Sequence, residues 1–261
     1  MRRSVGLAAA MLVIAGTLSG CGGPADAGAN GACALDAPVK VGAALSLTGD
    51  AAAYGAAQRN ALELARDQLN ARGGVQYDLA VEDDATDPKQ GITVFENLIA
   101  RRGVSIVLGP TLSNGAMQTD PVAQAFQVPV LGMSNTATGI TDIGDYVFRD
   151  SLSETAVVPQ TVAKAKAAFG LRRVVLMYSD DDAMTESGYQ AFRKTLESNG
   201  LEIAKTVTFA KNDSDFRAKL ADAKAAAPDA LVVSALIEAA IHIVSQAREV
   251  GITAPIIGNN G

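Results

Sequence analysis

From Pro38 to its end, the chain alternates short apolar runs with segments of helical periodicity. The apolar runs are bounded by Gly, Pro and Asp, which predicts that they are β-strands. The predicted strands are residues 39–45, 77–81, 105–108, 128–131, 173–177, 203–209, 230–234 and 255–257. Between them apolar residues recur on one helical face, as Leu62, Ala65 and Leu69 do within residues 54–70. Buried strands separated by single helices are typical of parallel sheets covered on both faces, so we predict an α/β fold.

The alternation is interrupted once, which indicates two sheets. Residues 145–154 leave the first series, and Val157 begins a new helical pattern. We therefore predict a first lobe over residues 38–150 and a second over residues 151–261. Ligands of open parallel sheets bind beyond the carboxyl ends of the strands. Two lobes that face each other across such edges predict a cleft that closes on a solute.

The N-terminus has the pattern of an export signal. Two arginines precede an apolar run at residues 5–18, which is the length of a secretory signal core and too short to span a bilayer. The run ends in Leu-Ser-Gly-Cys at Cys21, which is similar to a bacterial lipobox. We predict a signal peptide over residues 1–20, lipidation of Cys21 and a flexible tether over residues 21–37, so that the mature protein is anchored outside the cytoplasmic membrane. The alternative is an ordinary signal peptide with a chance cysteine.

Composition excludes several classes of partner. The formal net charge is -6 and Lys and Arg form no cluster, which argues against nucleic acid. Trp is absent and aromatic residues make up 5% of the chain, which argues against a platform for stacking carbohydrate. If Cys21 is lipidated, Cys33 is left over, and an odd thiol in an oxidising compartment suggests a missing partner.

Catalytic and metal-binding patterns are absent from the sequence. The single histidine, His242, falls on the polar side of its helix with Glu238, which is typical of a solvated side chain. There is no nucleophile elbow, Walker A loop, dinucleotide fingerprint or Cys/His metal spacing. Asp83 and Asp84 are interpreted as loop and helix-capping residues, and residues 180–182 as a solvated acidic turn. We therefore predict no catalytic residue, no metal and no cofactor.

Several blocks together resemble one family. "VGAALSLTGDAAAYGAAQRNALELARDQLNARGGV", "VEDDATDPKQGITVFENLIARRGVSIVLGPTLSNGA", "VPVLGMSNTATGIT", "SGYQAFRKTLESNGLEI" and "REVGITAPIIGNNG" are similar to the branched-chain amino acid (Leu/Ile/Val-binding) type of periplasmic binding protein. The resemblance covers residues 38–261 and implies a type I two-lobe fold. Family members continue beyond this point, so it also implies that the chain is truncated, with the first lobe lacking its last strands and the second lobe partial. The alternative is a shortened natural protein with uncovered strand edges.

In the first lobe, hydroxyl-rich loops follow the predicted strands. In "GPTLSNGA", Ser113 or Asn114 can cap a helix whose free N–H groups suit a carboxylate. The resemblance implies that Ser113 binds the ligand's carboxylate, that Ser134 and Thr136 hold its backbone, and that Tyr54 covers it. The alternatives are helix capping, turn chemistry and packing.

In the second lobe the sequence departs from the family. Met184 and Leu236 stand where relatives often have aromatic residues. In some family members an acidic residue that neutralises the ligand's ammonium aligns near Asn260. We predict that Met184 and Leu236 line an apolar pocket, and that Asp181 or Glu238 pairs with the ammonium. We also predict that Asn114 and Asn260 bind the ligand.

The resemblance implies a binding function without catalysis. It predicts an extracytoplasmic substrate-binding lipoprotein of an ABC importer, which binds an amino acid or a related small molecule between its lobes and delivers it to a membrane permease. A ligand-sensing two-lobe receptor is the first alternative, and an extracytoplasmic α/β hydrolase that depends on Ser113 is the second.

Overall fold

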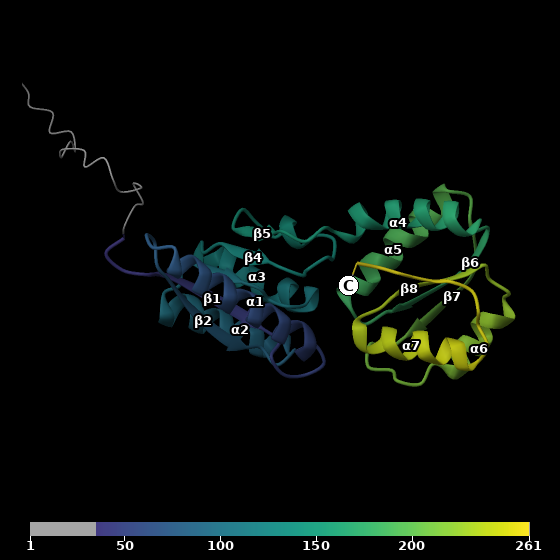
Figure 1. The fold of residues 1–261 in the computed structure, drawn as a ribbon, viewed down its shortest axis with the longest axis horizontal. Helices are drawn as coiled ribbons and strands as arrows, with labels where there is room; N and C mark the ends of the chain where they lie inside the picture. Colours follow the sequence, from purple (N-terminus) through teal and green to yellow (C-terminus); the bar gives the residue numbers. More distant parts are fainter. Residues whose placement is uncertain (1–34, 261) are drawn as a thin grey trace, which may run out of the picture. The chain divides into compact units, whose positions relative to one another are not determined.

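The computed structural model of the chain describes residues 35–260. The predicted signal peptide, Cys21, Cys33 and the tether up to residue 34 lie outside these residues. Within them the chain forms two separate parallel sheets, each covered by helices (Figure 1). The sheets define two lobes, the first running from purple to teal and the second from teal to yellow in Figure 1.

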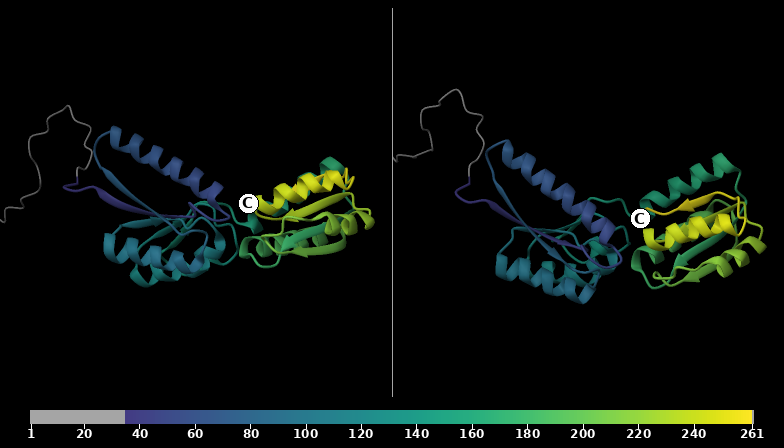
Figure 2. Two further views of the ribbon diagram at one scale, coloured as in Figure 1. Left: turned by 90° about the horizontal axis from the view of Figure 1, so that it is seen from below. Right: turned by 60° about the horizontal axis from the view of Figure 1, so that its bottom comes forward.

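The first lobe is a five-stranded sheet in the order β2-β1-β3-β4-β5, with every described pair parallel. Its strands are β1 Val39–Leu45, β2 Tyr77–Asp83, β3 Ile106–Leu108, β4 Val130–Gly132 and β5 Val147–Arg149. Its helices are α1 Ala52–Ala71, α2 Pro88–Glu96, a π-helical continuation η1 Asn97–Arg102, α3 Ser113–Phe126 and a 3-10 turn η2 Ile140–Asp142. Helix α1 lies on one face of the sheet, and α2 and α3 lie on the other (Figure 2).

Only one face of this sheet has an extensive core among the described residues. The core lies between the sheet and helices α2 and α3, where Phe95, Leu98 and Val130 are fully buried. Helix α1 differs, because Gly55 is its one buried residue and Leu64 is 60% exposed. A β-carbon at Gly55 would collide with the backbone oxygen of Ser46, so glycine allows α1 to begin against the end of β1.

The second lobe is a four-stranded parallel sheet in the order β7-β6-β8-β9. Its strands are β6 Arg173–Ser179, β7 Glu202–Phe209, β8 Ala230–Ser234 and β9 Ile256–Gly258. Its helices are α4 Glu154–Phe169, α5 Ala183–Ser198, α6 Arg217–Ala225 and α7 Ile237–Glu249. Helices α4 and α5 cover one face and α6 and α7 the other (Figure 1).

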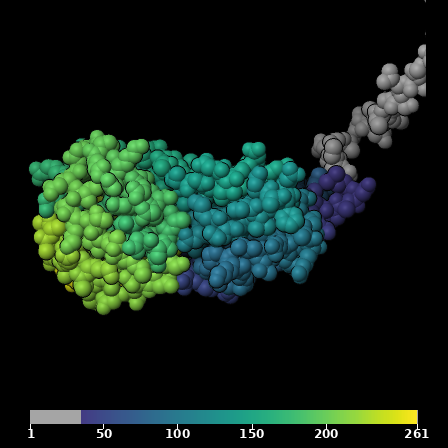
Figure 3. All heavy atoms as spheres, turned by 180° about the vertical axis from the view of Figure 1, so that it is seen from behind, coloured from purple at the N-terminus to yellow at the C-terminus, as the bar shows by residue number. Residues whose placement is uncertain are grey.

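Both faces of the second sheet carry a core, because alternate residues of a strand point to opposite faces. Val174 and Leu176 of β6 belong to the cluster with α4 and α5, whereas Val175 and Met177 belong to the cluster with α6 and α7. A space-filling view shows the residues of the two lobes as separately coloured masses (Figure 3).

The predicted α/β fold with two parallel sheets is confirmed. All eight predicted strands are present, and β5 is an additional strand within the segment that we expected to carry the chain out of the first lobe. Because all strands of a sheet are parallel, their carboxyl ends lie at one edge. Loops that leave these edges lead into helices α3, α5 and α7, and Ser113, Met184 and Leu236 lie at these helix starts.

Candidate functional site

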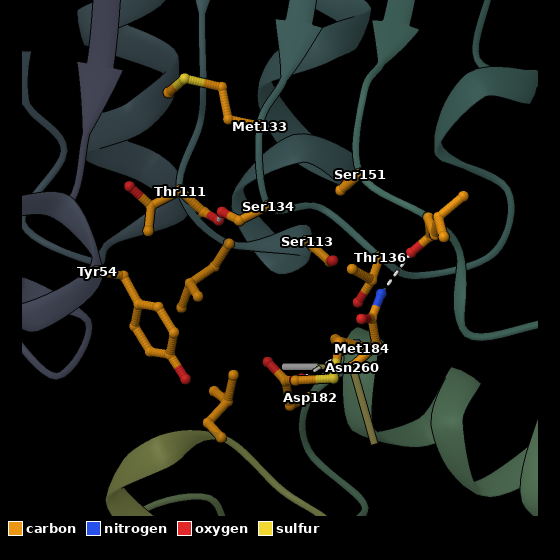
Figure 4. A pocket seen from close by; sticks show the side chains of 13 residues that line it. Tyr54, Thr111, Ser113, Met133, Ser134, Thr136, Ser151, Asp182, Met184 and Asn260 are labelled. Atoms are coloured by element: carbon orange, nitrogen blue, oxygen red, sulfur yellow. Dashed lines mark hydrogen bonds between the residues drawn. The ribbon is translucent and has the colours of Figure 1, made fainter. Parts of the chain in front are cut away.

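A cavity of about 310 Å³ lies where loops from the carboxyl ends of both sheets come together (Figure 4). Its lining residues are Tyr54, Thr111, Leu112, Ser113, Met133, Ser134, Thr136, Ser151, Leu152, Asp182, Met184, Leu236 and Asn260. Ser113 and Thr136 lie on one side of the cavity, and Tyr54 lies on the opposite side (Figure 4). The lining therefore combines hydroxyl, amide and carboxyl side chains with leucine, methionine and tyrosine side chains.

The structure brings seven of the eight predicted ligand-binding residues to this cavity. They are Tyr54, Ser113, Ser134, Thr136, Met184, Leu236 and Asn260. Asn114 is the exception, because it lines a neighbouring groove instead. Its side-chain oxygen accepts a hydrogen bond from the backbone N–H of Ala183, 2.8 Å away, so Asn114 joins the two lobes.

The start of helix α3 is built to hold an anion. Gly109 precedes it with φ +115°, and a β-carbon there would collide with the Ala44 carbonyl, so this tight turn requires glycine. The helix begins at Ser113, and its N-cap is Leu112, which provides no side-chain hydrogen bond. Ser113 is thus not the cap that one interpretation predicted. The first-turn N–H groups and the positive end of the helix dipole are left for a ligand.

Ser113 and Thr136 present opposite hydrogen-bonding character to the cavity. Oγ of Ser113 accepts from the backbone N–H of Ala137 at 3.3 Å, so the hydroxyl proton remains available for donation. Oγ1 of Thr136 donates to Oε1 of Glu154 at 2.8 Å, so its lone pairs remain available for acceptance. One hydroxyl therefore suits a carboxylate and the other suits an ammonium.

Glu154 places a carboxyl group directly behind Thr136. Its side chain is fully buried at the first position of helix α4, and the backbone N–H of Asn260 lies 3.4 Å from Oε2. Burial raises the pKa of the Glu154 carboxyl, and the hydrogen bonds from Thr136 and Asn260 oppose that shift. No Lys or Arg among residues 35–260 forms an ion pair with it. A buried carboxylate of this kind favours a cation in the cavity.

Ser134 reaches the cavity, but its hydroxyl already has both kinds of partner. It donates to the carbonyl of Thr111 at 2.6 Å and accepts from the amide of Gln58 at 2.7 Å. Thr111 in turn donates to the Gln58 side-chain oxygen at 2.7 Å and accepts from the N–H of Ser46 at 2.9 Å. This closed network fixes the loop, and neither Gln58 nor Thr111 was predicted from the sequence to belong to it.

The acidic groups of the second lobe differ from those predicted. Asp181 and Glu238, expected as partners for an ammonium, do not line the cavity. Asp182 lines it instead, is 4% exposed, and caps helix α5 by accepting from the N–H groups of Met184 and Thr185 at 3.0 and 3.1 Å. The acidic turn predicted to be solvated is therefore buried at its last residue. Burial raises the pKa of the Asp182 carboxyl, against the effect of these hydrogen bonds.

Tyr54 connects the two lobes across the cavity. Its hydroxyl oxygen accepts a hydrogen bond from the backbone N–H of Ile237 at 3.1 Å. Ile237 is the first residue of helix α7, whose N-cap, Leu236, provides no side-chain hydrogen bond. The tyrosine of the first lobe thus satisfies a free donor at a helix start of the second lobe.

Other features of the described residues do not add a second chemistry to the site. No group of three or more His, Cys, Asp or Glu side chains within residues 35–260 is arranged to hold a metal ion. None of the helices in that range has the length and apolar character needed to cross a bilayer. His242 is exposed on α7, as its helical position predicted. Asp83 accepts from the N–H groups of Leu47 and Ala85, which is the loop role predicted for it.

Comparisons with known proteins agree with this architecture. The chain is 28% identical over 86% of its length to the Leu/Ile/Val-binding protein BraC3 of Rhizobium johnstonii, covering 62% of that protein. It is 26% identical over 85% of its length to the leucine-, isoleucine-, valine-, threonine- and alanine-binding protein of Pseudomonas aeruginosa, covering 60% of it. The chain thus spans about 60% of the length of these curated relatives.

A solved structure has the same fold over most of the chain. The branched-chain amino acid transporter substrate-binding protein LivJ of Streptococcus pneumoniae, in complex with isoleucine, matches with a TM-score of 0.80 and 29% identity. The match covers 85% of this chain and 64% of that one.

A profile described as periplasmic binding protein matches residues 38–260. This match confirms the predicted resemblance, and it confirms the prediction that the chain is not an enzyme, because the family consists of solute-binding proteins. The chain belongs to the periplasmic binding protein family.

Proposed function

We propose that this protein is the extracytoplasmic substrate-binding component of an ABC importer and binds an amino acid of the branched-chain class in the cavity between its lobes. One observation carries the proposal: a hydroxyl donor at an uncapped helix start and a hydroxyl acceptor backed by a buried carboxylate line the same cavity. That pair matches the two charged groups of an α-amino acid. The relatives named above, which bind such amino acids, support the proposal.

In this proposal the ligand's carboxylate lies at the start of α3, where Ser113 and the free N–H groups donate to it. Its ammonium donates to Thr136, and Glu154 supplies the compensating negative charge through that hydroxyl. Glu154 thereby takes the part of the acidic residue that the resemblance placed near Asn260. The apolar side chain contacts Met184 and the leucines of the cavity.

Ligand binding is expected to favour a closed arrangement of the lobes. Both lobes contribute residues to the cavity, so a ligand that contacts both binds the closed state more tightly than the open state. Direct hydrogen bonds support the same arrangement, from Ile237 to Tyr54, from Ala183 to Asn114 and from Thr138 to Ser187. The closed form is the one proposed to be presented to the permease.

The proposed location depends on the N-terminal sequence. The lipobox-like Leu-Ser-Gly-Cys at Cys21 and the preceding apolar run support a lipid anchor on the outer face of the cytoplasmic membrane. Cys21→Ala is expected to move the protein from the membrane fraction to the soluble extracytoplasmic fraction. Retention of the variant in washed membranes would contradict lipidation at this position.

The binding function is tested by thermal unfolding of the full-length protein with a panel of leucine, isoleucine, valine, alanine, acetamide and benzoate. A hundredfold excess of a true ligand over its dissociation constant raises the free energy of unfolding by roughly 3 kcal/mol. We expect this rise with at least one branched-chain amino acid, and its loss at the same concentration in Ser113→Ala. Stabilisation by benzoate or acetamide alone would contradict the proposed ligand class.

A further inference from the structure

A second cavity of about 150 Å³ adjoins the first between the lobes. Its lining residues are Asp50, Ala51, Thr86, Leu112, Lys211, Asn212, Asp213, Ser214, Leu236, Glu238 and His242. Leu112 and Leu236 line both cavities, and no other residue is shared between the two sets. One leucine comes from the first lobe and the other from the second, so the pair stands between the two spaces.

The two leucines occupy equivalent positions in their lobes. Leu112 is the N-cap of α3, and Leu236 is the N-cap of α7. Leucine is a poor N-cap because its side chain cannot accept from the first N–H groups, and Ser, Thr, Asp or Asn is preferred there. Helices α2 and α5 of the same chain have that preferred arrangement, with Asp87 and Asp182 as caps. At the starts of α3 and α7, unlike that of α5, an apolar side chain therefore stands at the cavity where a capping side chain would stabilise the helix.

The second cavity differs in chemistry from the apolar part of the first. Asp50 and Glu238 face it from opposite lobes, together with Lys211 and His242. Burial raises the pKa of the Glu238 carboxyl, and the charge of Asp50 raises it further, which indicates that the two carboxyls are near each other. An apolar chain end that entered this space would remove water from charged groups without replacing their hydrogen bonds.

We propose that Leu112 and Leu236 form a length stop, which limits the ligand to a side chain that ends within the first cavity. The inference rests on the proposed function, because it assumes that the ligand's carboxylate and ammonium are held at Ser113 and Thr136. With that end fixed, the side chain extends towards the two leucines, and a chain as long as that of arginine would have to pass between them.

The test measures dissociation constants of leucine, citrulline and arginine for the full-length protein and for Leu236→Ala. Citrulline and arginine have side chains of similar length, one neutral and one cationic. Removal of the leucine side chain joins the two cavities, so the affinity of both long ligands relative to leucine is expected to rise by about tenfold or more. Leu112→Ala, on the other lobe, is expected to do the same and serves if Leu236→Ala fails to fold.

Leu152→Ala is the matched control, because Leu152 lines the first cavity and not the second. It is expected to weaken all three ligands without changing their ratios. If the affinities of citrulline and arginine relative to leucine are unchanged in both Leu112→Ala and Leu236→Ala, the length stop is overturned. A gain in affinity for arginine without one for citrulline would also overturn it, because a leucine stop acts on length and not on charge. If the unaltered protein binds no amino acid at all, the proposed function fails and the length stop fails with it. If it binds leucine but the variants leave the relative affinities of the three ligands unchanged, only the length stop is overturned.

Discussion

Glu154→Gln is expected to weaken the binding of leucine by about 100-fold, which corresponds to about 2.7 kcal/mol. The substitution keeps the size of the side chain and an oxygen that accepts from Thr136, but it removes the buried negative charge behind that hydroxyl. The ligand's ammonium then loses its compensating charge in a site from which water is excluded. Isothermal titration calorimetry of the two full-length proteins measures the effect.

Two controls separate loss of charge from loss of structure. The first is 4-methylpentanoate, which is leucine without its amino group. It is expected to bind more weakly than leucine, and with the same affinity to the unaltered protein and to Glu154→Gln. The second is Asp150→Asn, which removes an exposed carboxylate outside the cavity and is expected to leave leucine binding unchanged. An equal loss for leucine and 4-methylpentanoate in Glu154→Gln would contradict the role of the charge.

Asp120→Asn is expected to remove a large part of the pH dependence of stability. Asp120 is 1% exposed within α3, and its Oδ2 has no hydrogen-bond partner among the described residues. Burial raises the pKa of its carboxyl from 3.8 to about 7, and the hydrogen bond from Thr119 opposes the shift only weakly. Because the folded state holds this proton more tightly than the unfolded state, the contribution of Asp120 to stability is fully present below about pH 4 and is lost as the pH rises through 7.

The shift corresponds to about 4 kcal/mol between pH 4 and pH 8. Urea unfolding of both proteins at a series of pH values measures the difference in free energy of unfolding. The free energy of unfolding of Asp120→Asn is expected to rise relative to that of the unaltered protein by about 4 kcal/mol between pH 4 and pH 8. Asp229→Asn is the control, because N–H groups of Arg172 and Arg173 lower the pKa of the Asp229 carboxyl, so its difference from the unaltered protein changes with the opposite sign below about pH 4 and stays constant between pH 4 and pH 8. A difference between Asp120→Asn and the unaltered protein that is constant with pH would contradict a buried, neutral Asp120.

The fold was predictable because its strands are short, apolar and separated by clear helical patterns. The strand over Val39–Leu45 has its predicted bounds, as does Ala230–Ser234. Strand β5 was missed because Val147–Arg149 is three residues long and its middle residue, Phe148, is exposed, so it lacks the buried run by which the other strands were recognised. The expectation that helices bury both faces holds for the second sheet. It does not hold for α1, whose Leu64 and Leu69 remain exposed among the described residues.

The residues of the site were predictable where they follow a strand in an obvious loop, as Ser113, Thr136 and Leu236 do. Glu154 was not, because an acidic residue in the first turn of a helix is ordinarily a solvated partner of the helix dipole. Its burial results from contacts with Thr136 and Asn260, which are 18 and 106 positions away. Gln58 was missed for the same reason, since its partners Thr111 and Ser134 lie 53 and 76 positions away. Local patterns contain no signal for such pairs.

The central claim is that one cavity recognises both ends of an amino acid through Ser113 and Thr136. A crystal structure of the full-length protein with bound leucine tests it most directly. We predict the carboxylate within hydrogen-bond distance of Ser113 Oγ and the first N–H groups of α3, and the ammonium within that distance of Thr136 Oγ1. A leucine that is bound elsewhere, or whose charged groups contact neither hydroxyl, would contradict the account.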